Sequence, residues 1–526
     1  MRPDFIIGGI LMKKKLLTLA ALSLAGFMLA GCGARESEPS EAGNQTEGNQ
    51  IEGNQAEGNR YADENGEGTA EEGRRPIERE WLSPQAWQFD AGFTETPMDL
   101  GGRLVRIVTA EGYSLFNYWY WDPRGIDATP NETHDIINAM SQIAEDFNAE
   151  FEFIHTQSGA DIRESMLQSR LAGDPTYDLI NMGLTHANKT PFANERLFLD
   201  MRHPSVNDII GLDDGQPWAE AGRLMTQGGA QLGVHFLMAN SGQLLRSVMV
   251  FNKDHMSTFN LGNFYEMVHN NTWTWDTFEN ICSRVWIESN QRITPIGIRR
   301  ESEIAPNFMK ANGGTLIDFV GGRAVFVGDI NEPALEAFAF LQRMHQNNWI
   351  YNGTWSAGDA NTSAWMRAAA GDIMFLAGLY EPLRQFRRAE IPTDFHWGML
   401  PTPMGPRMTE YVSAQVAADM WYIANDTHNH HEIAAILVAM ANRLSKINVV
   451  QHELEVGLFD EESAEIMYML LNNVVVDYSR AVGGARNEIS SGLNNVIQGF
   501  QTPVAAMQAR AQVIQNHLDT VDFLVR

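Results

Sequence analysis

Cysteine is scarce in this sequence, which contains only Cys32 and Cys282 among its 526 residues. A framework of several disulfides, typical of small secreted domains, is therefore excluded. Cys282 lies within residues 278–285, where the apolar spacing is typical of a helix. A lone cysteine in such a position is predicted to be a small core residue. A nucleophilic role for Cys282 is the minor alternative.

The sequence also lacks an amino-terminal apolar run long enough to cross a membrane. The basic stretch Lys13–Lys15 is followed by the apolar stretch Leu16–Met28, which is shorter than the roughly 20 residues of a membrane-spanning helix. A charged start, a short apolar segment and small residues before a cleavage site predict a secretory signal peptide. A transmembrane anchor with an incidental cysteine is the disfavoured alternative.

The segment Leu29-Ala30-Gly31-Cys32 resembles the lipobox of a bacterial lipoprotein signal. The resemblance implies cleavage before Cys32, a lipid on the Cys32 thiol, and a mature protein tethered to the outer face of a membrane. We therefore expect a signal peptide over residues 1–31, with Met12 as the natural start. With Cys32 lipidated, Cys282 has no partner for an intrachain disulfide.

Positive charge is sparse, with 38 Lys and Arg against 66 Asp and Glu and a net charge of −28. Such a chain repels nucleic acid, so we expect no nucleic-acid partner. The sequence contains no GxSxG motif, no P-loop and no paired-cysteine metal site. His428, His430 and His431 lie close together, but histidines at that spacing in a loop rarely reach one ion with proper geometry. We expect no metal and no cofactor.

Apolar side chains are nearly missing from residues 33–80, which contain a near repeat of five residues: Thr46–Gln50, Ile51–Gln55 and Ala56–Arg60. Such a segment buries too little apolar surface to offset the loss of chain entropy on folding. Residues 32–85 are therefore predicted to be the lipidated cysteine and a disordered acidic tether. Calcium binding by these carboxylates is the weaker alternative, because their spacing differs from that of a calcium loop.

From about residue 100 onward, segments in which the apolar residues have the spacing of a strand alternate with segments in which they have the spacing of a helix. This alternation predicts a mainly parallel sheet with helices on its faces, and ligands of such sheets lie beyond the carboxyl ends of the strands. The predicted strands are 103–109, 151–154, 177–182 and 247–252. The predicted helices are 136–148, 161–171, 335–345, 433–444, 463–473, 503–518, and one opened by Thr274 as N-cap.

An ordered series of segments resembles the extracellular solute-binding proteins of ABC importers, in the sugar-binding, maltodextrin-binding-protein-like group (family 1). The series spans roughly residues 100–450. It comprises Tyr177-Asp178-Leu179-Ile180, Met249–Asp254, Thr274–Phe278, Asn312-Gly313-Gly314, Ala368–Tyr380, His396–Pro401 and Ala417–Ala424. Gly378-Leu379-Tyr380 departs from the Gly-Pro-Trp of the group, which argues against a maltodextrin-like specificity.

The resemblance implies an α/β fold of type II, with two lobes, each a mainly parallel sheet flanked by helices, joined by a hinge of crossing strands. Lobe one is expected over residues 100–250 plus 401–450, and lobe two over 251–400. Residues 451–526 are expected to form helices that pack on the lobes. The implied hinge residues are Phe251, Asn252, Leu400 and Pro401.

Recognition of a sugar requires aromatic platforms for its C–H faces and polar side chains for its hydroxyls. Near predicted strand ends, the candidates are Glu111, Tyr113, Trp119, Asn181, His186, Arg299, Arg300, Tyr380, Glu381 and Trp421. Core packing is an equal alternative for the aromatics of residues 118–121 and for Trp421. A structural role is the commoner one for His186, and surface charge for the arginine pair.

The resemblance implies a monomeric receptor that captures a carbohydrate, an oligosaccharide by expectation, and delivers it to ABC transporter permease subunits. A lipid on Cys32 would hold it near its permease, which favours a Gram-positive-type cell surface. Two alternatives use the same features: a surface carbohydrate-active enzyme, and a ligand-sensing subunit of a membrane sensor kinase. An enzyme needs two carboxylates about 5–10 Å apart, and no motif here pairs two.

Overall fold

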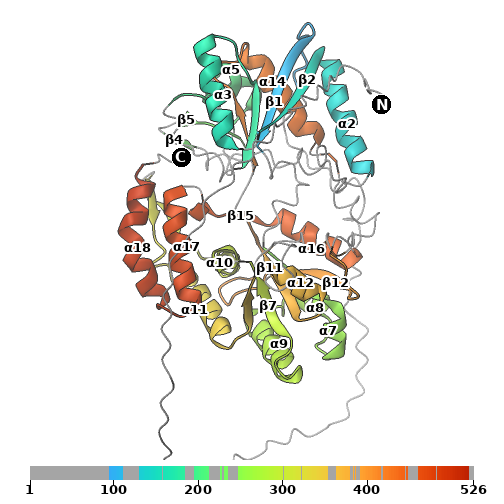
Figure 1. Ribbon diagram of the computed structural model, residues 1–526, viewed down its shortest axis with the longest axis vertical. Coiled ribbons are helices and arrows are strands. Elements are labelled where there is room, and N and C mark those ends of the chain that lie inside the picture. The colour runs from blue at the N-terminus through green and yellow to red at the C-terminus, as the bar shows by residue number, and fades with distance from the viewer. Residues whose placement is uncertain are drawn as a thin grey trace, which may run out of the picture. The chain divides into compact units, whose positions relative to one another are not determined.

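The computed structural model describes residues 94–110, 130–156, 158–183, 195–212, 226–227, 230–234, 247–299, 301–320, 323–353, 363–378, 383, 386, 391–415, 419–444, 446–447, 460–480 and 483–520 (Figure 1). All of them belong to the one of two compact units that contains residues 81–526. The predicted signal peptide, Cys32 and tether lie outside the described residues. Within them, two separate sheets with flanking helices confirm the predicted α/β class.

The first sheet has the strand order β14-β3-β1-β2. Strands β1 (Arg103–Ala110), β2 (Ala149–Thr156) and β3 (Leu179–Gly183) are parallel, and β14 (Asp419–Ile423) runs antiparallel beside β3. Only one strand is reversed, so the sheet is mixed but mainly parallel, as the alternation of strands and helices predicts.

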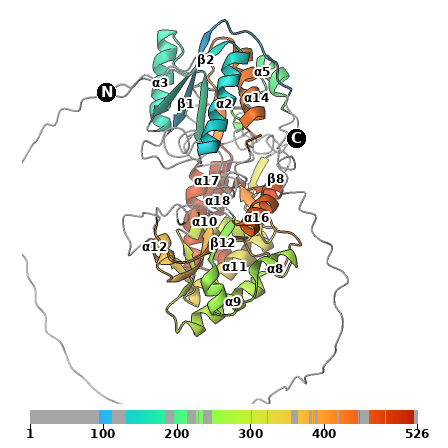
Figure 2. The same cartoon turned by 90° about the vertical axis from the view of Figure 1, so that its right-hand side faces the viewer.

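Apolar side chains alternate between the two faces of this sheet because successive strand residues point to opposite sides. Val105 and Ile107 share one buried cluster with the helices α2 (Pro130–Asp146), α5 (Pro204–Ile210) and α14 (His430–Leu444). Val108 and Ile180 join the other cluster with α3 (Gly159–Ala172). Figure 2 shows α3 on one side of β1 and β2, with α2 and α14 on the other.

The second sheet has the order β10-β7-β11-β6-β12, in which only β6 runs against its neighbours. Its strands are β6 (Val248–Asn252), β7 (Thr294–Ile298), β10 (Ile350–Asn352), β11 (Ile373–Gly378) and β12 (Trp397–Pro401). Its helices are α7 (Lys253–Thr258), α8 (Phe264–His269), α9 (Trp275–Glu288), α10 (Glu301–Lys310), α11 (Glu332–Gln346) and α12 (Ala364–Ala369).

Local signals place several helix starts where the sequence predicts them. Thr274 caps α9, since its side chain accepts a hydrogen bond from the Thr277 N–H, and Asp276 lies in the first turn. Thr502 caps α18 (Pro503–Leu518) in the same way, with Pro503 at the first helical position. These two predicted starts are confirmed, because a side-chain cap acts locally and needs no distant partner.

The carboxyl-terminal helices contact elements of the second sheet. The Met399 N–H, on the edge strand β12, donates to Ser463 Oγ of α16 (Glu461–Asn472) at 3.0 Å, which satisfies an edge group. The side-chain amide of Gln515 in α18 bonds the Phe326 N–H at 2.9 Å and the Ala324 carbonyl at 3.0 Å. It thereby pairs with one strand of the hairpin β8 (Ile317–Val320) and β9 (Arg323–Phe326). Helix α17 (Gly483–Ile497) packs on α10 and α11.

Short elements complete the described chain. Strands β13 (Ser413–Gln415) and β15 (Val474–Val476) pair in parallel, and β4 (Thr226–Gln227) and β5 (Ala230–Gln231) pair antiparallel. A single 3-10 turn, η3 (Tyr478–Arg480), follows β15.

The segment after β12 is predicted to belong to lobe one from residue 401, and this boundary stays a prediction. The Trp275 N–H donates to the Met404 carbonyl at 3.0 Å, and the Gly405 N–H donates to the Ala311 carbonyl at 2.8 Å. The Arg407 guanidinium bonds both carboxylate oxygens of Glu336 in α11 at 2.7 Å. Residues 401–412 therefore pack with the second sheet's helices, and the return to the first sheet falls between β13 and β14.

The predicted hinge residues all lie inside the second sheet. Phe251 and Asn252 are fully buried at the end of β6, where Asn252 Oδ1 caps α7 by accepting the His255 N–H at 2.9 Å. The chain enters β6 at the other end, where Val248 pairs with Pro401. Phe251 and Asn252 thus lie at the end of β6 opposite to the one where the chain enters it, and the hinge stays a prediction.

Candidate ligand site at the carboxyl edges of the sheets

The carboxyl ends of the first sheet's parallel strands define one edge of that sheet. Strands β1, β2 and β3 end there at Ala110, Thr156 and Gly183, and β14 begins there at Asp419 because it runs antiparallel. Ligands of open α/β sheets bind outside this edge. The residues near these strand ends are therefore the described residues closest to a candidate ligand site.

Thr109, Asn181 and Trp421 form one row across three strands at this edge. Asn181 of β3 pairs in register with Thr109 of β1 on one side and with Trp421 of β14 on the other. Their exposed fractions are 1%, 2% and 3%, respectively. The structure thus brings together two residues, Asn181 and Trp421, that the sequence singled out separately, and adds Thr109, which sequence reasoning missed.

The amide of Asn181 is incompletely hydrogen-bonded. Its Nδ2 donates to the Met420 carbonyl at 3.5 Å, the long limit of a hydrogen bond, whereas its buried Oδ1 accepts no hydrogen bond from the described residues. A buried acceptor without a donor costs about 1–3 kcal/mol of stability. Below this row on the same face lie only apolar side chains, Ile107, Leu179 and Ile423. The amide is thus a polar group placed where the strands end.

Trp421 is held by backbone pairing as well as by packing. Its N–H donates to the Val234 carbonyl at 2.8 Å, and the Val234 N–H donates back at 2.9 Å. Its ring belongs to the same buried cluster as Leu179 and Ile423. This burial favours the core-packing alternative that the sequence left open for Trp421.

The corresponding edge of the second sheet has a different character, because its central strand ends in glycine. Gly378 closes β11 with a φ of 128°, a conformation that L side chains rarely adopt, and among the described residues no heavy atom beyond its chain neighbours lies within 4 Å of the position of a Cβ. Arg299 follows β7 directly and is half-buried. The backbone at Gly378 is therefore open to a ligand, and Arg299 is the described charged candidate at this edge.

The remaining predicted ligand residues lie outside the described residues, so their roles stay predictions. They are Glu111, Tyr113, Trp119, His186, Arg300, Tyr380 and Glu381.

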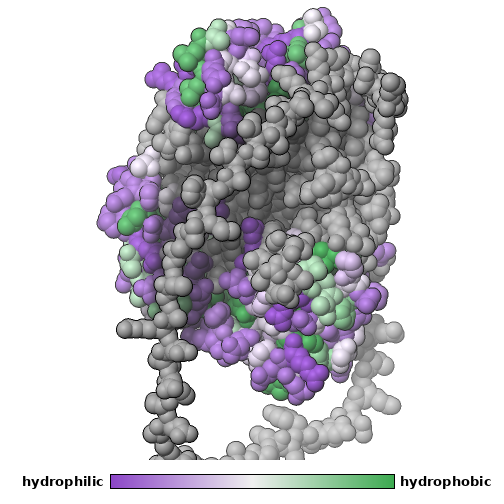
Figure 3. Space-filling view, viewed as in Figure 1, coloured by the Kyte–Doolittle hydropathy of each residue, from purple (hydrophilic) through white to green (hydrophobic). Residues whose placement is uncertain are grey.

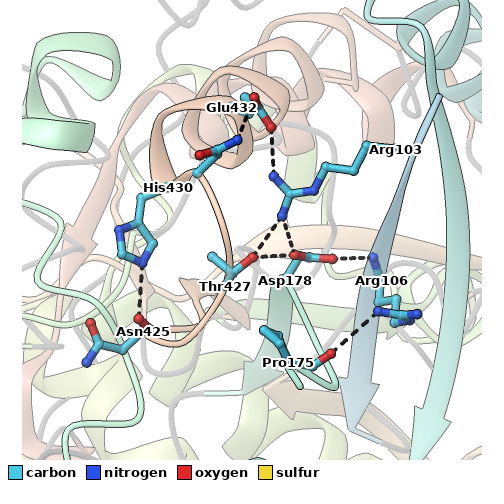
Figure 4. A network of polar contacts seen from close by, with 9 residues as sticks. Arg103, Arg106, Pro175, Asp178, Asn425, Thr427, His430 and Glu432 are labelled. Atoms are coloured by element: carbon cyan, nitrogen blue, oxygen red, sulfur yellow. Dashed lines mark hydrogen bonds and ion pairs between the residues drawn. The ribbon is translucent and has the colours of Figure 1, made fainter. Parts of the chain in front are cut away.

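At the opposite, amino edge of the first sheet, a polar network joins four parts of the chain (Figure 4). Arg103 bonds Asp178 at 2.8 Å and Glu432 at 2.7 Å through separate guanidinium nitrogens. The second oxygen of Asp178 accepts the Arg106 N–H at 2.8 Å, and Thr427 donates its hydroxyl hydrogen to the first. The buried carboxylate of Asp178 is therefore fully compensated. This network braces the sheet, and sequence reasoning missed it.

Two further sequence predictions concern residues that the structure describes. The Cys282 side chain is fully buried, and burial raises the pKa of its thiol well above the usual value, which favours the core role over a nucleophilic one. His430 opens α14, and its ring contacts the Asn425 carbonyl at 3.1 Å. Within the described ranges, no three His, Cys, Asp or Glu side chains are grouped to hold a metal ion.

The face of the described chain that Figure 3 shows is mostly polar. Hydrophilic residues dominate the coloured surface in Figure 3, and apolar residues form scattered spots. Among the helices that the structure describes, none combines the length and the apolar character needed to cross a membrane.

Comparison with known proteins finds similarity in structure alone. No protein-family model matches the sequence, and no curated protein matches it. The cyclic α-maltosyl-1,6-maltose binding protein of Arthrobacter globiformis superposes with a TM-score of 0.53 at 10% identity, over 80% of this chain and 99% of that one. A cyclo/maltodextrin-binding protein in complex with maltotetraose gives 0.52 at 12% identity, over 80% and 98%.

A third solved structure holds a different kind of ligand. UgpB from Mycobacterium tuberculosis, in complex with glycerophosphocholine, gives a TM-score of 0.51 at 13% identity over 80% of this chain and 98% of that one. Two of these three proteins are named as binding proteins, and UgpB is described by its complex with glycerophosphocholine. The chain therefore has the two-lobed, periplasmic-binding-protein-like fold of maltodextrin-binding-like solute-binding proteins, as the sequence predicts.

Proposed function

We propose that this protein is an extracellular substrate-binding protein that captures a carbohydrate, an oligosaccharide, and delivers it to the permease subunits of an ABC transporter. The observation that carries the proposal is the fold, which matches nearly the full length of the three similar proteins. Two of these are named for, or hold, maltose-derived oligosaccharides. The ordered sequence segments that resemble the sugar-binding group support the same function.

The two carboxyl edges supply complementary chemistry for a neutral, hydroxyl-rich ligand. The first edge offers the Asn181 amide with an acceptor to spare, and the second offers the open backbone of Gly378 and the guanidinium of Arg299. Arginine bonds neighbouring hydroxyls or a carboxylate with its planar fork, which also admits acidic sugars. The aromatic platforms would come from Tyr113, Trp119 and Tyr380. Closure by hinge bending between the lobes would then enclose the ligand.

We further propose that binding occurs without turnover, since two of the similar proteins are named as binding proteins. The lipid on Cys32 and the acidic tether would keep a monomeric receptor close to its permease on the outer face of the membrane. A ligand-sensing subunit of a sensor kinase would bind the same ligand, and permease genes beside this one would favour the transport function.

A thermal-shift screen of the mature protein tests the proposal. The panel contains maltotetraose, cyclic glucans, acidic oligosaccharides, glycerophosphocholine and unrelated amino acids. A ligand at a hundred times its Kd stabilises the folded state by about 2.7 kcal/mol, so a true ligand raises the melting temperature with concentration. Chromatography of the same mixtures is expected to show unchanged glycan. Stabilisation by glycerophosphocholine alone would contradict carbohydrate as the ligand class, and release of a sugar product would contradict a receptor.

A further inference from the structure

We infer that Asn181 is a specificity-determining residue of this site, whose Oδ1 receives an O–H hydrogen bond from the bound carbohydrate. This inference rests on the proposed function. The first observation is the position of Asn181 on β3, between Thr109 and Trp421, two residues before the carboxyl end of the strand at Gly183. The next row on that face, away from the carboxyl edge, contains the apolar side chains of Ile107, Leu179 and Ile423.

The second observation is the unpartnered acceptor itself. The side chain is 2% exposed, its Nδ2 makes one long bond to the Met420 carbonyl, and its Oδ1 has no donor among the described residues. A leucine, which has the same branching but more bulk, would suit the neighbouring apolar side chains of Leu179 and Ile423 and would leave no acceptor unsatisfied. Stability alone therefore disfavours asparagine here, which is typical of positions where function opposes stability.

The chemistry of the vacant bond selects the class of ligand group. An amide oxygen accepts a hydrogen bond and repels a carboxylate or phosphate oxygen, so it fits a hydroxyl and not an anionic group. Among the described residues of this row, Asn181 Oδ1 is the buried acceptor that lacks a hydrogen-bond donor. Asn181 therefore favours neutral sugars whose hydroxyl enters at this edge and discriminates against analogues that lack that hydroxyl.

The test compares wild type with Asn181→Leu, using the tightest oligosaccharide of the panel that includes maltotetraose, and its monodeoxy derivatives. Without glycan, Asn181→Leu is expected to melt about 2 °C higher than wild type, because the orphaned acceptor is gone. Its affinity is expected to fall about tenfold, which corresponds to 1.4 kcal/mol. One monodeoxy derivative is expected to bind wild type about tenfold more weakly than the parent sugar does. The same derivative and the parent sugar are expected to bind Asn181→Leu with equal affinity, because the substitution and the missing hydroxyl remove the same hydrogen bond.

A matched control is Ser141→Ala, which removes another buried, unpartnered oxygen on α2 and is expected to leave the affinity unchanged. If the leucine variant misfolds, Asn181→Ala removes the acceptor without added bulk and is subject to the same affinity and deoxy-sugar measurements. Equal glycan affinities of wild type and the Asn181 variant, or additive losses for every deoxy sugar, overturn the inference alone. Failure of wild type to bind any glycan overturns the proposed function and the inference with it.

Discussion

Buried polar groups at the two edges of the first sheet differ in how completely they are hydrogen-bonded. At the amino edge, the carboxylate of Asp178 receives the Arg103 guanidinium, the Arg106 N–H and the Thr427 hydroxyl. At the carboxyl edge, Asn181 keeps an acceptor without a donor among the described residues. The strands and the core between these edges are shared, so the difference reflects what each edge does. A complete network stabilises the sheet, and an incomplete one is available to a ligand.

The network at the amino edge also joins segments that are distant in sequence. Arg103 and Asp178 precede the excursion of the chain into the second sheet, whereas Thr427 and Glu432 follow its return. Their contacts connect β1 with α14 and with the segment between β14 and α14. We expect this network to stabilise the first sheet and its helices and to have no effect on ligand affinity.

The largest effect is expected when the amino edge is broken. Asp178→Ala leaves Arg103 paired with Glu432 alone and removes the acceptor of the Arg106 N–H and the Thr427 hydroxyl. Because Glu432 still compensates the guanidinium, we expect a loss near the lower end of the range of about 3–5 kcal/mol that breaking a buried ion pair costs. Urea denaturation of the ligand-free protein is expected to show this loss, with oligosaccharide affinity of the folded fraction unchanged. Asp174→Ala, at an exposed position nearby, is the control and is expected to stay near wild type. If Asp178→Ala lowers the affinity for oligosaccharide but not the stability, the amino edge binds ligand, which contradicts its assigned role in stability.

A smaller effect is expected at the carboxyl edge of the second sheet. Gly378→Ala forces an L side chain into a φ of 128°, which costs about 1–3 kcal/mol of stability, and also fills the open space above β11. We expect both a lower melting temperature and a weaker binding of oligosaccharide. Gly173→Ala is the matched control, since Gly173 has a φ of 73° and open space but lies at the end of α3. If both variants bind equally well, Gly378 does not border the ligand.

The smallest effect concerns acid sensitivity at another fully paired network, where α16 begins. Burial raises the pKa of Asp460, but the Lys253 ammonium at 2.7 Å and the hydrogen bonds from Ser463 outweigh it, so the pKa lies below its usual value. A lowered pKa stabilises the folded state above about pH 4, and this stabilisation is lost as the pH falls through the folded-state pKa. The melting temperature of wild type is therefore expected to fall more steeply below about pH 4 than that of Asp460→Asn. Parallel acid profiles would show that this pair contributes nothing measurable.

Much of the fold could be predicted because its signals are local. The strand at β1, the helix at α14 and the starts of α9 and α18 follow from apolar spacing and from caps such as Thr274. The resemblance in the order of segments predicted the fold class, which the structure confirms. Helices were predicted over residues 451–526 in general, but the bounds of α17 were not, because its glycine-rich start at Gly483 lacks the usual helix signals.

The candidate site was less predictable, because it depends on contacts between distant segments. Asn181 and Trp421 were each singled out for lying near strand ends, but only the antiparallel return of β14 makes them register partners. The contacts that Met404 and Arg407 form with α9 and α11 were not predicted, because these segments are far apart in sequence. The Arg103 network likewise has no local signature. Such pairings follow from topology, which apolar spacing does not specify.

The central claim is that ligand binds at the carboxyl edges and not at the amino edge. Hydrogen–deuterium exchange of the mature protein, with and without the tightest oligosaccharide of the screen, tests this most directly. We expect glycan to slow exchange in peptides that contain Asn181 and Gly378, where β3 and β11 end, and to leave peptides with Arg103 and Asp178 unchanged. Protection confined to the amino edge, or no protection at either carboxyl edge with glycan bound, would contradict the account.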